Sequence, residues 1–272
     1  MNVSRRHLLG LAALLPLTGC AAKKPPQPTA SPAPTTKPAP QHPVHDRLTE
    51  LEADYRARLG VYAVDTGDGT TITHRADERF AFCSTFKGLA AAAVLAGNPV
   101  THLDKLVRYT RDDLLAHAPI TERHVARGMT IRQLCDAAVR YSDGTAGNLL
   151  VRDLGGPDRL TAFLRRRGDT VTRMDRLEPH ITTAVPGDPR DTTSPRAIGT
   201  AYRDVVLGDA LPAGKRDFLR DLLERNTTGG NRIRAGVPRD WVVADKTGTG
   251  SYGTLNDIAV VWRSKSADPL LI

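Results

Sequence analysis

The sequence predicts an α/β fold of the α+β sandwich type, in which both ends of the folded region contribute strands to one antiparallel sheet. Strand-like runs at 60–64 and 70–73 flank the turn-forming residues 65–69, a pattern typical of a hairpin. Similar runs at 241–246 and 255–262 flank a second glycine-rich turn. Because the chain between these hairpins has mostly helical periodicity, we expect an all-helical insertion between the two halves of the sheet.

The helices are predicted from apolar spacing and from end signals. Leu48, Leu51, Tyr55 and Leu59 recur at helical spacing, so an amphipathic helix is expected over 46–58. Another helix is expected to open at Ser84. The capping-box pattern Thr130-Ile131-Arg132-Gln133 marks a further helix start, and the remaining helices are expected near 146–154, 157–167, 195–207 and 213–225.

Residues 1–20 have the character of an export signal and do not belong to the fold. Arg5 and Arg6 precede an apolar stretch from Leu8 to Leu17, which is shorter than the ~20 residues that a membrane-spanning helix needs. The paired arginines resemble a twin-arginine signal, and the run that ends at Cys20 resembles a bacterial lipoprotein box. We therefore expect export, followed by lipid anchoring through Cys20 to the outer face of the cell membrane or by secretion after processing. An ordinary signal peptide that contains a cysteine is the alternative.

Residues 21–45 are interpreted as a disordered linker between this signal and a folded domain at 46–272. The linker contains eight prolines among small and polar residues. Such a composition buries too little apolar surface to fold and favours extended chain.

The charge and the histidine pattern exclude two classes of partner. The net charge of +8 would permit nucleic-acid binding. However, aromatic residues make up only 5% and no run of five basic residues occurs, so we expect no nucleic-acid partner and interpret the charge as an aid to solubility. No two histidines share a helix face at metal-ligand spacing, so no metal is expected.

Ser84 and Lys87 form the one Ser-x-x-Lys pattern in the chain. The pattern precedes the helix-forming run 88–95, which would place the hydroxyl at a helix N-terminus, where free N–H groups favour negative charge. The spacing puts Lys87 on the same face, where a desolvated amine can accept the serine proton and activate a nucleophile. The alternative is a serine N-cap beside a solvated lysine.

Three further patterns follow Ser84 along the chain. Ser142-Asp143-Gly144 lies in a break between helices, Glu178-Pro179 lies in a long loop, and Lys246-Thr247-Gly248 ends a strand. With this combination, residues 46–272 resemble the class A serine β-lactamases. The resemblance implies a serine β-lactamase or penicillin-binding transpeptidase-like fold, a monomer, no cofactor, and a small-molecule β-lactam as substrate.

The resemblance also implies a role for each motif. Ser84 would attack the lactam carbonyl of penicillins and cephalosporins and form an acyl-enzyme, and Lys87 and Glu178 would share the removal of its proton. Ser142, linked to Lys246, would pass a proton to the departing lactam nitrogen. Glu178 would then activate the water that releases the acyl group, and its bond to Pro179 is expected to be cis.

Substrate binding is expected at the second strand hairpin. Lys246, Thr247 and Thr249 would hold the substrate carboxylate, and the backbone N–H groups of Ser84 and Thr249 would form the oxyanion hole. Arg232 occupies a position from which some members of the family supply a further positive charge to the carboxylate, with a plain surface arginine as the alternative.

Several positions depart from the family pattern. Gly144 occupies a position where asparagine is usual. Thr182 occupies a position where an asparagine helps Glu178 hold the hydrolytic water, so deacylation is the step that this second difference is expected to affect. Ala91 replaces the usual disulfide partner of Cys135. The sequence stops at Ile272, early in what the resemblance implies to be the last strand, so we expect the final strand and helix to be truncated.

Two other functions stay open. A penicillin-binding receptor or D-alanyl-D-alanine peptidase of the same fold would become acylated but turn over slowly. Thr182 favours this alternative, whereas Glu178 in its loop argues against it. A non-catalytic surface lipoprotein is the second alternative, and the complete set of Ser84, Lys87, Ser142 and Lys246 argues against it.

Overall fold

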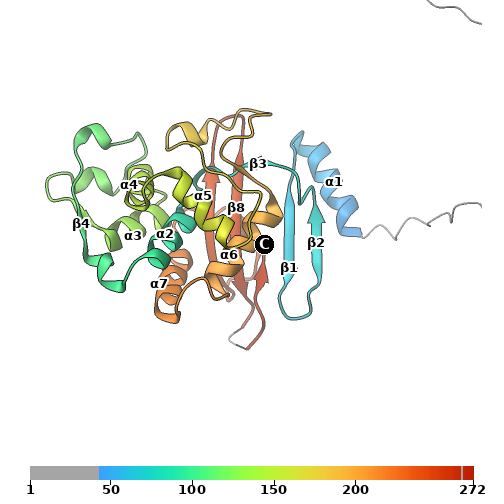
Figure 1. Ribbon diagram of the computed structural model, residues 1–272. Helices are drawn as coiled ribbons and strands as arrows, with labels where there is room; N and C mark the ends of the chain where they lie inside the picture. The colour runs from blue at the N-terminus through green and yellow to red at the C-terminus, as the bar shows by residue number, and fades with distance from the viewer. Residues whose placement is uncertain (1–42, 265) are drawn as a thin grey trace, which may run out of the picture. The chain divides into compact units, whose positions relative to one another are not determined.

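A computed structural model describes residues 43–264 and 266–272 (Figure 1). Its main sheet has five strands in the order β2-β1-β9-β8-β7, which are β1 Val61–Asp65, β2 Thr71–His74, β7 Val242–Thr249, β8 Leu255–Trp262 and β9 Leu270–Leu271. Every neighbouring pair is antiparallel. The prediction of one antiparallel sheet from both ends of the folded region is confirmed, because β9 pairs with both β1 and β8.

Side chains alternate between the two faces of this sheet, as strand geometry requires. Ala244 and Val260 face the main core, whereas the adjacent Val243 and Val261 belong to a smaller cluster on the other face. Helix α6 contacts β8 and β1, and α7 contacts β7, so the helical insertion covers the main-core face of the sheet (Figure 1).

The segment between the two hairpins is mainly helical, as predicted. Its helices are α2 Phe86–Gly97, α3 Ile131–Arg140, α4 Gly144–Leu154, α5 Pro157–Arg166, α6 Pro195–Val206, α7 Ala213–Glu224 and α8 Ile233–Gly236. Every residue of α2 from Phe86 to Leu95 is buried, since α3, α4, α5, α6 and α7 all contact this helix. The small side chains of its four consecutive alanines allow such close packing on all sides.

The first helix, α1 Pro43–Tyr55, lies three residues earlier than the prediction of 46–58. It starts before the predicted domain boundary, so Pro43–His45 belong to the helix and not to the linker, and proline is well tolerated in a first helical turn. The helix ends early because Arg56 has a left-handed φ of 47°, a conformation that terminates helices.

Two short ladders attach loops to the helical region. They pair β3 Phe80–Ala81 with β6 Thr192–Thr193, and β4 Leu106–Val107 with β5 Met129–Thr130. The first ladder ties the segment before Ser84 to the end of the loop that carries Glu178. The capping box at Thr130 is confirmed, with reciprocal bonds between Thr130 and Gln133.

The predicted export signal, its Cys20, and residues 21–42 of the predicted linker lie outside the described residues. Among the helices of residues 43–264 and 266–272, none combines the length and apolar character that crossing a membrane requires.

Candidate active site

Ser84 lies in the short 3₁₀ turn Cys83–Thr85, directly before α2. The α-helix itself begins at Phe86, two residues later than predicted, because the Phe86 N–H donates to the carbonyl of Cys83 and so winds the turn more tightly than an α-helix. The Ser84 hydroxyl donates to Glu178 Oε1 at 2.9 Å, and Lys87 Nζ donates to the Ser84 oxygen at 3.1 Å. The serine is therefore held between a carboxylate and an amine.

Lys87 is fully buried, with 0% of its surface exposed. Its ammonium group also donates to the Ser142 carbonyl at 2.6 Å and pairs with Glu178 Oε1 at 2.8 Å. Burial lowers the pKa of Lys87, while the charge of Glu178 opposes that shift. The interpretation of Lys87 as a solvated lysine is wrong, because the amine lies in the core against Ser84.

Ser142 and Lys246 are in direct contact. Lys246 Nζ donates to Ser142 Oγ at 3.0 Å, as the resemblance implied. Burial, aided by the positive charge of Lys87, lowers the pKa of Lys246 to about 7. Ser142 has a left-handed φ of 55° in the break between α3 and α4, a conformation that is uncommon outside glycine and that turns the chain sharply at this point.

Glu178 reaches Ser84 from a long loop, and its bond to Pro179 is cis, as expected. Asn148 of α4 holds the loop at this residue. The Asn148 side chain donates to the Glu178 carbonyl at 2.8 Å and accepts from the Glu178 N–H at 3.0 Å. Sequence reasoning missed Asn148. The signal that could have found it was an asparagine in the middle of a helix, where this residue is a poor former and needs a local reason.

The two ends of the Glu178 loop are joined by Arg176 and the buried Asp191. Asp191 accepts from Arg176 Nε at 2.6 Å and from the backbone N–H groups of Asp175 and Arg176. The Asp191 side chain is only 1% exposed, so these partners, and not water, stabilise its negative charge.

Replacing Arg176 with alanine is expected to lower the free energy of unfolding by about 3 kcal/mol, because a buried carboxylate loses its cation. Urea unfolding monitored by circular dichroism measures this loss. Arg47→Ala, which removes an exposed ion pair with Glu50 in α1, is the control and should leave the midpoint unchanged. Equal midpoints for Arg176→Ala and the parent would show that Asp191 does not need Arg176.

The predicted substrate-binding residues lie along the end of β7. Thr247 is buried and its hydroxyl contacts that of Thr228, whereas Thr249 is exposed. Arg232 donates to Thr249 Oγ1 at 3.2 Å and to the Asn256 carbonyl at 2.9 Å. The guanidinium group thus lies against Thr249, which favours the interpretation of Arg232 as a substrate-binding residue over its interpretation as a plain surface arginine. Thr228 is a second residue that sequence reasoning missed.

Thr182 lies in the Glu178 loop, but its hydroxyl is directed elsewhere. It donates to the Pro179 carbonyl at 2.8 Å. Among the hydrogen bonds of the described residues, none joins Thr182 to the Glu178 carboxylate. The expected role of Thr182 in holding water therefore stays a prediction.

The two described cysteines do not form a disulfide: Cys83 and Cys135 are both free and buried. Burial raises the pKa of each thiol to about 12, which suppresses the reactive thiolate. Within the described part of the chain, His, Cys, Asp and Glu side chains form no group that could hold a metal ion.

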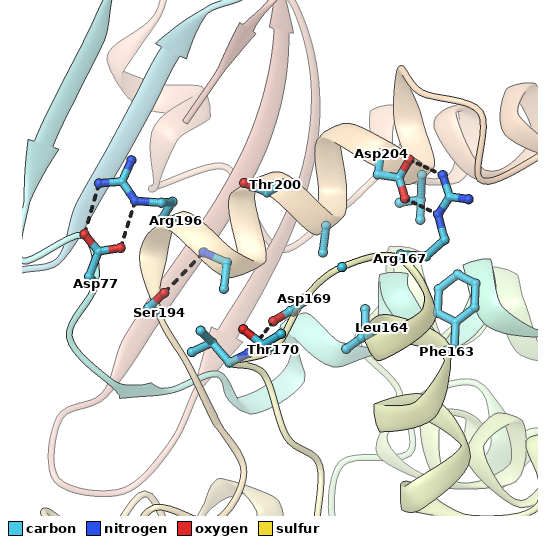
Figure 2. A pocket seen from close by; sticks show the side chains of 15 residues that line it. Asp77, Phe163, Leu164, Arg167, Asp169, Thr170, Ser194, Arg196, Thr200 and Asp204 are labelled. Carbon is cyan, nitrogen blue, oxygen red and sulfur yellow. Dashed lines mark hydrogen bonds and ion pairs between the residues drawn. The ribbon is translucent and has the colours of Figure 1, made fainter.

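A separate cavity of about 210 Å³ lies between α5 and α6 (Figure 2). Several of its charged side chains are paired with one another, Arg196 with Asp77 and Arg167 with Asp204. None of the residues predicted to act on a substrate lines this cavity. The predicted catalytic residues Ser84, Lys87, Ser142 and Glu178 lie elsewhere, in contact with one another.

Comparisons with known proteins find a family model and relatives that match most of the chain. Residues 43–271 match the model of a family described as the beta-lactamase enzyme family. A "Beta-lactamase" of Mycobacterium tuberculosis is 56% identical over 265 residues, which are 95% of this chain and 84% of that protein. A "Beta-lactamase" of Amycolatopsis lactamdurans is 58% identical over 237 residues, which are 87% of this chain and 76% of that protein.

Solved structures give the same result. The crystal structure of a beta-lactamase from Desulfarculus baarsii has a TM-score of 0.82 and 51% identity, covering 83% of this chain and 85% of that one. An ancestral class A beta-lactamase has a TM-score of 0.81 and 52% identity, covering 84% and 88% of the two chains.

Proposed function

Since this chain belongs to the beta-lactamase enzyme family and is a class A serine β-lactamase, we propose which of its residues hydrolyse the β-lactam ring. The observation that carries the proposal is the position of the Ser84 hydroxyl, which is hydrogen-bonded to Glu178 and Lys87 at once. A weak nucleophile becomes reactive when a base stands within hydrogen-bond reach of its proton.

In the first step, Ser84 Oγ attacks the lactam carbonyl carbon while its proton passes to the Glu178 carboxylate or the Lys87 amine. The backbone N–H groups of Ser84 and Thr249 stabilise the negative charge that develops on the carbonyl oxygen. The carbon–nitrogen bond of the ring then breaks. The departing nitrogen takes a proton from Ser142, whose hydroxyl is in contact with Lys246. The proton taken from Ser84 then replaces the one that Ser142 gave, so that Glu178 and Lys87 enter the second step in their original protonation states.

In the second step, a water molecule attacks the acyl carbonyl and gives a proton to Glu178. The bond to Ser84 breaks, Ser84 regains its proton, and the opened β-lactam leaves as a carboxylic acid. The Asn148 contacts to the backbone of Glu178 support this role, because a general base works only from a defined position.

A time course of chromogenic cephalosporin hydrolysis by the full chain, with intact-mass analysis of the same samples, tests the function. We expect many turnovers per enzyme and no turnover in Ser84→Ala. A single burst with a lasting mass adduct would instead favour the penicillin-binding alternative. Absence of both turnover and adduct would favour a non-catalytic lipoprotein.

The substrate carboxylate is proposed to bind Lys246, Thr247, Thr249 and Arg232. Because the pKa of Lys246 is about 7, its positive charge is present below pH 7 and is lost as the pH rises above it. Asp245, Asp257 and Glu178 favour the charged form and Lys87 opposes it.

We therefore expect the KM for penicillins to rise above pH 7, by up to about tenfold per pH unit. Steady-state kinetics from roughly pH 5.5 to roughly pH 8.5, a window around that pKa, measure the rise. An ester of the same penicillin lacks the carboxylate and should show a flat KM. A flat KM profile for the acid would show that Lys246 does not bind it through charge.

Arg232→Ala should raise the KM of the free acid at every pH, by the equivalent of about 1–3 kcal/mol.

We also propose export and lipid anchoring at Cys20, supported by the arginine pair and the small residues before the cysteine. Fractionation of cells that express the chain should place it with membranes, and Cys20→Ala should release it. Membrane association that persists in Cys20→Ala would contradict anchoring at this residue.

A monomer is proposed because one chain supplies every catalytic side chain. A mass of one chain, measured by light scattering, would support this proposal, whereas the mass of a dimer would contradict it.

A further inference from the structure

Asp257 of β8 ties the sheet to the segment that carries Arg232. Its Oδ2 accepts a hydrogen bond from the backbone N–H of Ile233 at 3.0 Å. Ile233 is the first residue of the short helix α8, and Arg232 directly precedes it in the N-cap position. The first N–H groups of a helix have no partner within the helix, and an arginine side chain has no acceptor atom with which to bind them. Asp257 therefore supplies this acceptor from strand β8.

The residue before Asp257 in the strand holds the other end of Arg232. The Asn256 carbonyl accepts from Arg232 Nη1 at 2.9 Å, and Thr249 Oγ1 accepts from Nη2 at 3.2 Å. The sheet thus fixes Arg232 twice, at the guanidinium group and at the peptide bond that follows its Cα. Ordering a long side chain costs conformational entropy, so a backbone that is already held leaves less entropy to be lost when the guanidinium group binds a substrate.

Two other backbone hydrogen bonds of Arg232 are local. Its N–H donates to the Gly229 carbonyl at 3.0 Å, and its carbonyl accepts from the Ala235 N–H at 2.9 Å. Both partners lie within three residues of Arg232 and would move with it. These two bonds shape the turn but do not fix it relative to the sheet, whereas the bond to Asp257 does.

A separate contact keeps this segment attached to the sheet when Asp257 is removed. Arg234 pairs with the buried carboxylate of Asp245 and donates to the Val243 carbonyl at 2.8 Å, both in β7. Loss of the Asp257 contact should therefore release the Arg232 end of the segment while the protein stays folded.

We propose that Asp257 is a positioning residue for substrate binding: its hydrogen bond to the Ile233 N–H keeps Arg232 directed at the place where the β-lactam carboxylate binds. This inference rests on the role proposed above for Arg232. Burial and the negative charge of Asp245 raise the pKa of Asp257 to about 7. Below that pH the side chain is mainly the uncharged acid, and asparagine resembles this form in size and in its carbonyl acceptor.

The test compares Asp257→Ala with Asp257→Asn by steady-state kinetics on benzylpenicillin and on its methyl ester. Roughly pH 6 is suitable, because Lys246 is then charged and Asp257 is mainly uncharged. Asp257→Ala should raise the KM of the acid roughly 3- to 10-fold, the size expected for a lost helix cap. The kcat and the KM of the ester should stay unchanged, since only carboxylate binding is weakened. Asp257→Asn keeps the acceptor and should restore the KM of the acid to within about twofold of the parent.

A double-mutant cycle shows whether the effect passes through Arg232. In the Arg232→Ala background, Asp257→Ala should change the KM of the acid less than about twofold, because residues that act through one contact are not additive. Asp217→Ala, at an exposed aspartate of α7, is the matched control and should behave as the parent.

Equal increases in KM with and without Arg232 would overturn the proposal, and so would an equal increase for the acid and the ester. A loss of kcat that Asp257→Asn does not restore would assign Asp257 a general structural role and would also overturn it. If Arg232→Ala raised the KM of the acid and Asp257→Ala did not, only the role of Asp257 would fail. If Arg232→Ala itself left that KM unchanged, the proposed role of Arg232 would fail, and the role of Asp257 with it.

Discussion

Replacing Glu178 with glutamine is expected to give an enzyme that benzylpenicillin acylates and that then stays acylated. Loss of the Glu178 charge removes an interaction that raises the pKa of the buried Lys87, so its amine, 3.1 Å from Ser84 Oγ, can be neutral and accept the serine proton. The attacking water, in contrast, loses the base proposed for it. A positioned general base contributes about 10²–10⁴-fold in rate, so the acyl-enzyme should persist that much longer.

Intact-mass analysis after brief exposure to benzylpenicillin measures this effect as a lasting adduct of one penicillin per chain. Glutamine retains the size of the side chain, and the Asn148 contacts involve only the backbone of Glu178, so the loop should keep its place. Glu122→Gln, at an exposed glutamate, is the matched control and should clear its adduct as the parent does. Rapid clearance in Glu178→Gln would show that the water has another base.

Replacing Lys87 with methionine is expected to suppress acylation itself. Methionine fills most of the same buried space but cannot accept or donate the proton. It also removes the cation that pairs with Glu178 at 2.8 Å, which leaves that carboxylate to hold Ser84 alone. The rate of adduct formation should fall by about 10²–10⁴-fold.

Rapid quenching followed by mass analysis separates this effect from the one at Glu178, since the Lys87 variant should show little adduct at early times. Lys105→Met, at an exposed lysine that pairs with Asp153, is the control and should acylate normally. If Lys87→Met formed adduct at the parental rate but released it slowly, Lys87 would serve deacylation and not the activation of Ser84.

Local chemistry explains why much of the fold was predictable. Apolar periodicity and turn residues placed the helices and strands to within a few residues, as at α5, α6, α7 and β8. The exceptions lie where local backbone geometry intervenes. Arg56 ends α1 through a left-handed φ, and the 3₁₀ turn at Ser84 delays the start of α2. Neither effect can be predicted from the hydrophobic pattern.

The site was predictable where a motif carries its chemistry in a short stretch. Ser84 and Lys87 could be predicted from one local pattern, and Ser142, Glu178 and Lys246 could be predicted from short motifs through the family resemblance. Asn148 and Thr228 could not, because each acts on a partner far away in the chain, Glu178 and Thr247 respectively.

By itself, the sequence predicted the order of the elements, the pair Ser84 and Lys87 proposed as nucleophile and amine, and the family to which its motifs point. The elements and the Ser84–Lys87 pair depend on residues within a turn or two of one another, whereas the family depends on the combination of four short motifs along the chain. Only the tertiary structure decided that β9 joins the two ends of the sheet, that Arg232 lies against Thr249, and that Asn148 holds the backbone of Glu178. Those contacts depend on how distant segments pack, and packing at ångström precision is set by the whole core rather than by any local pattern.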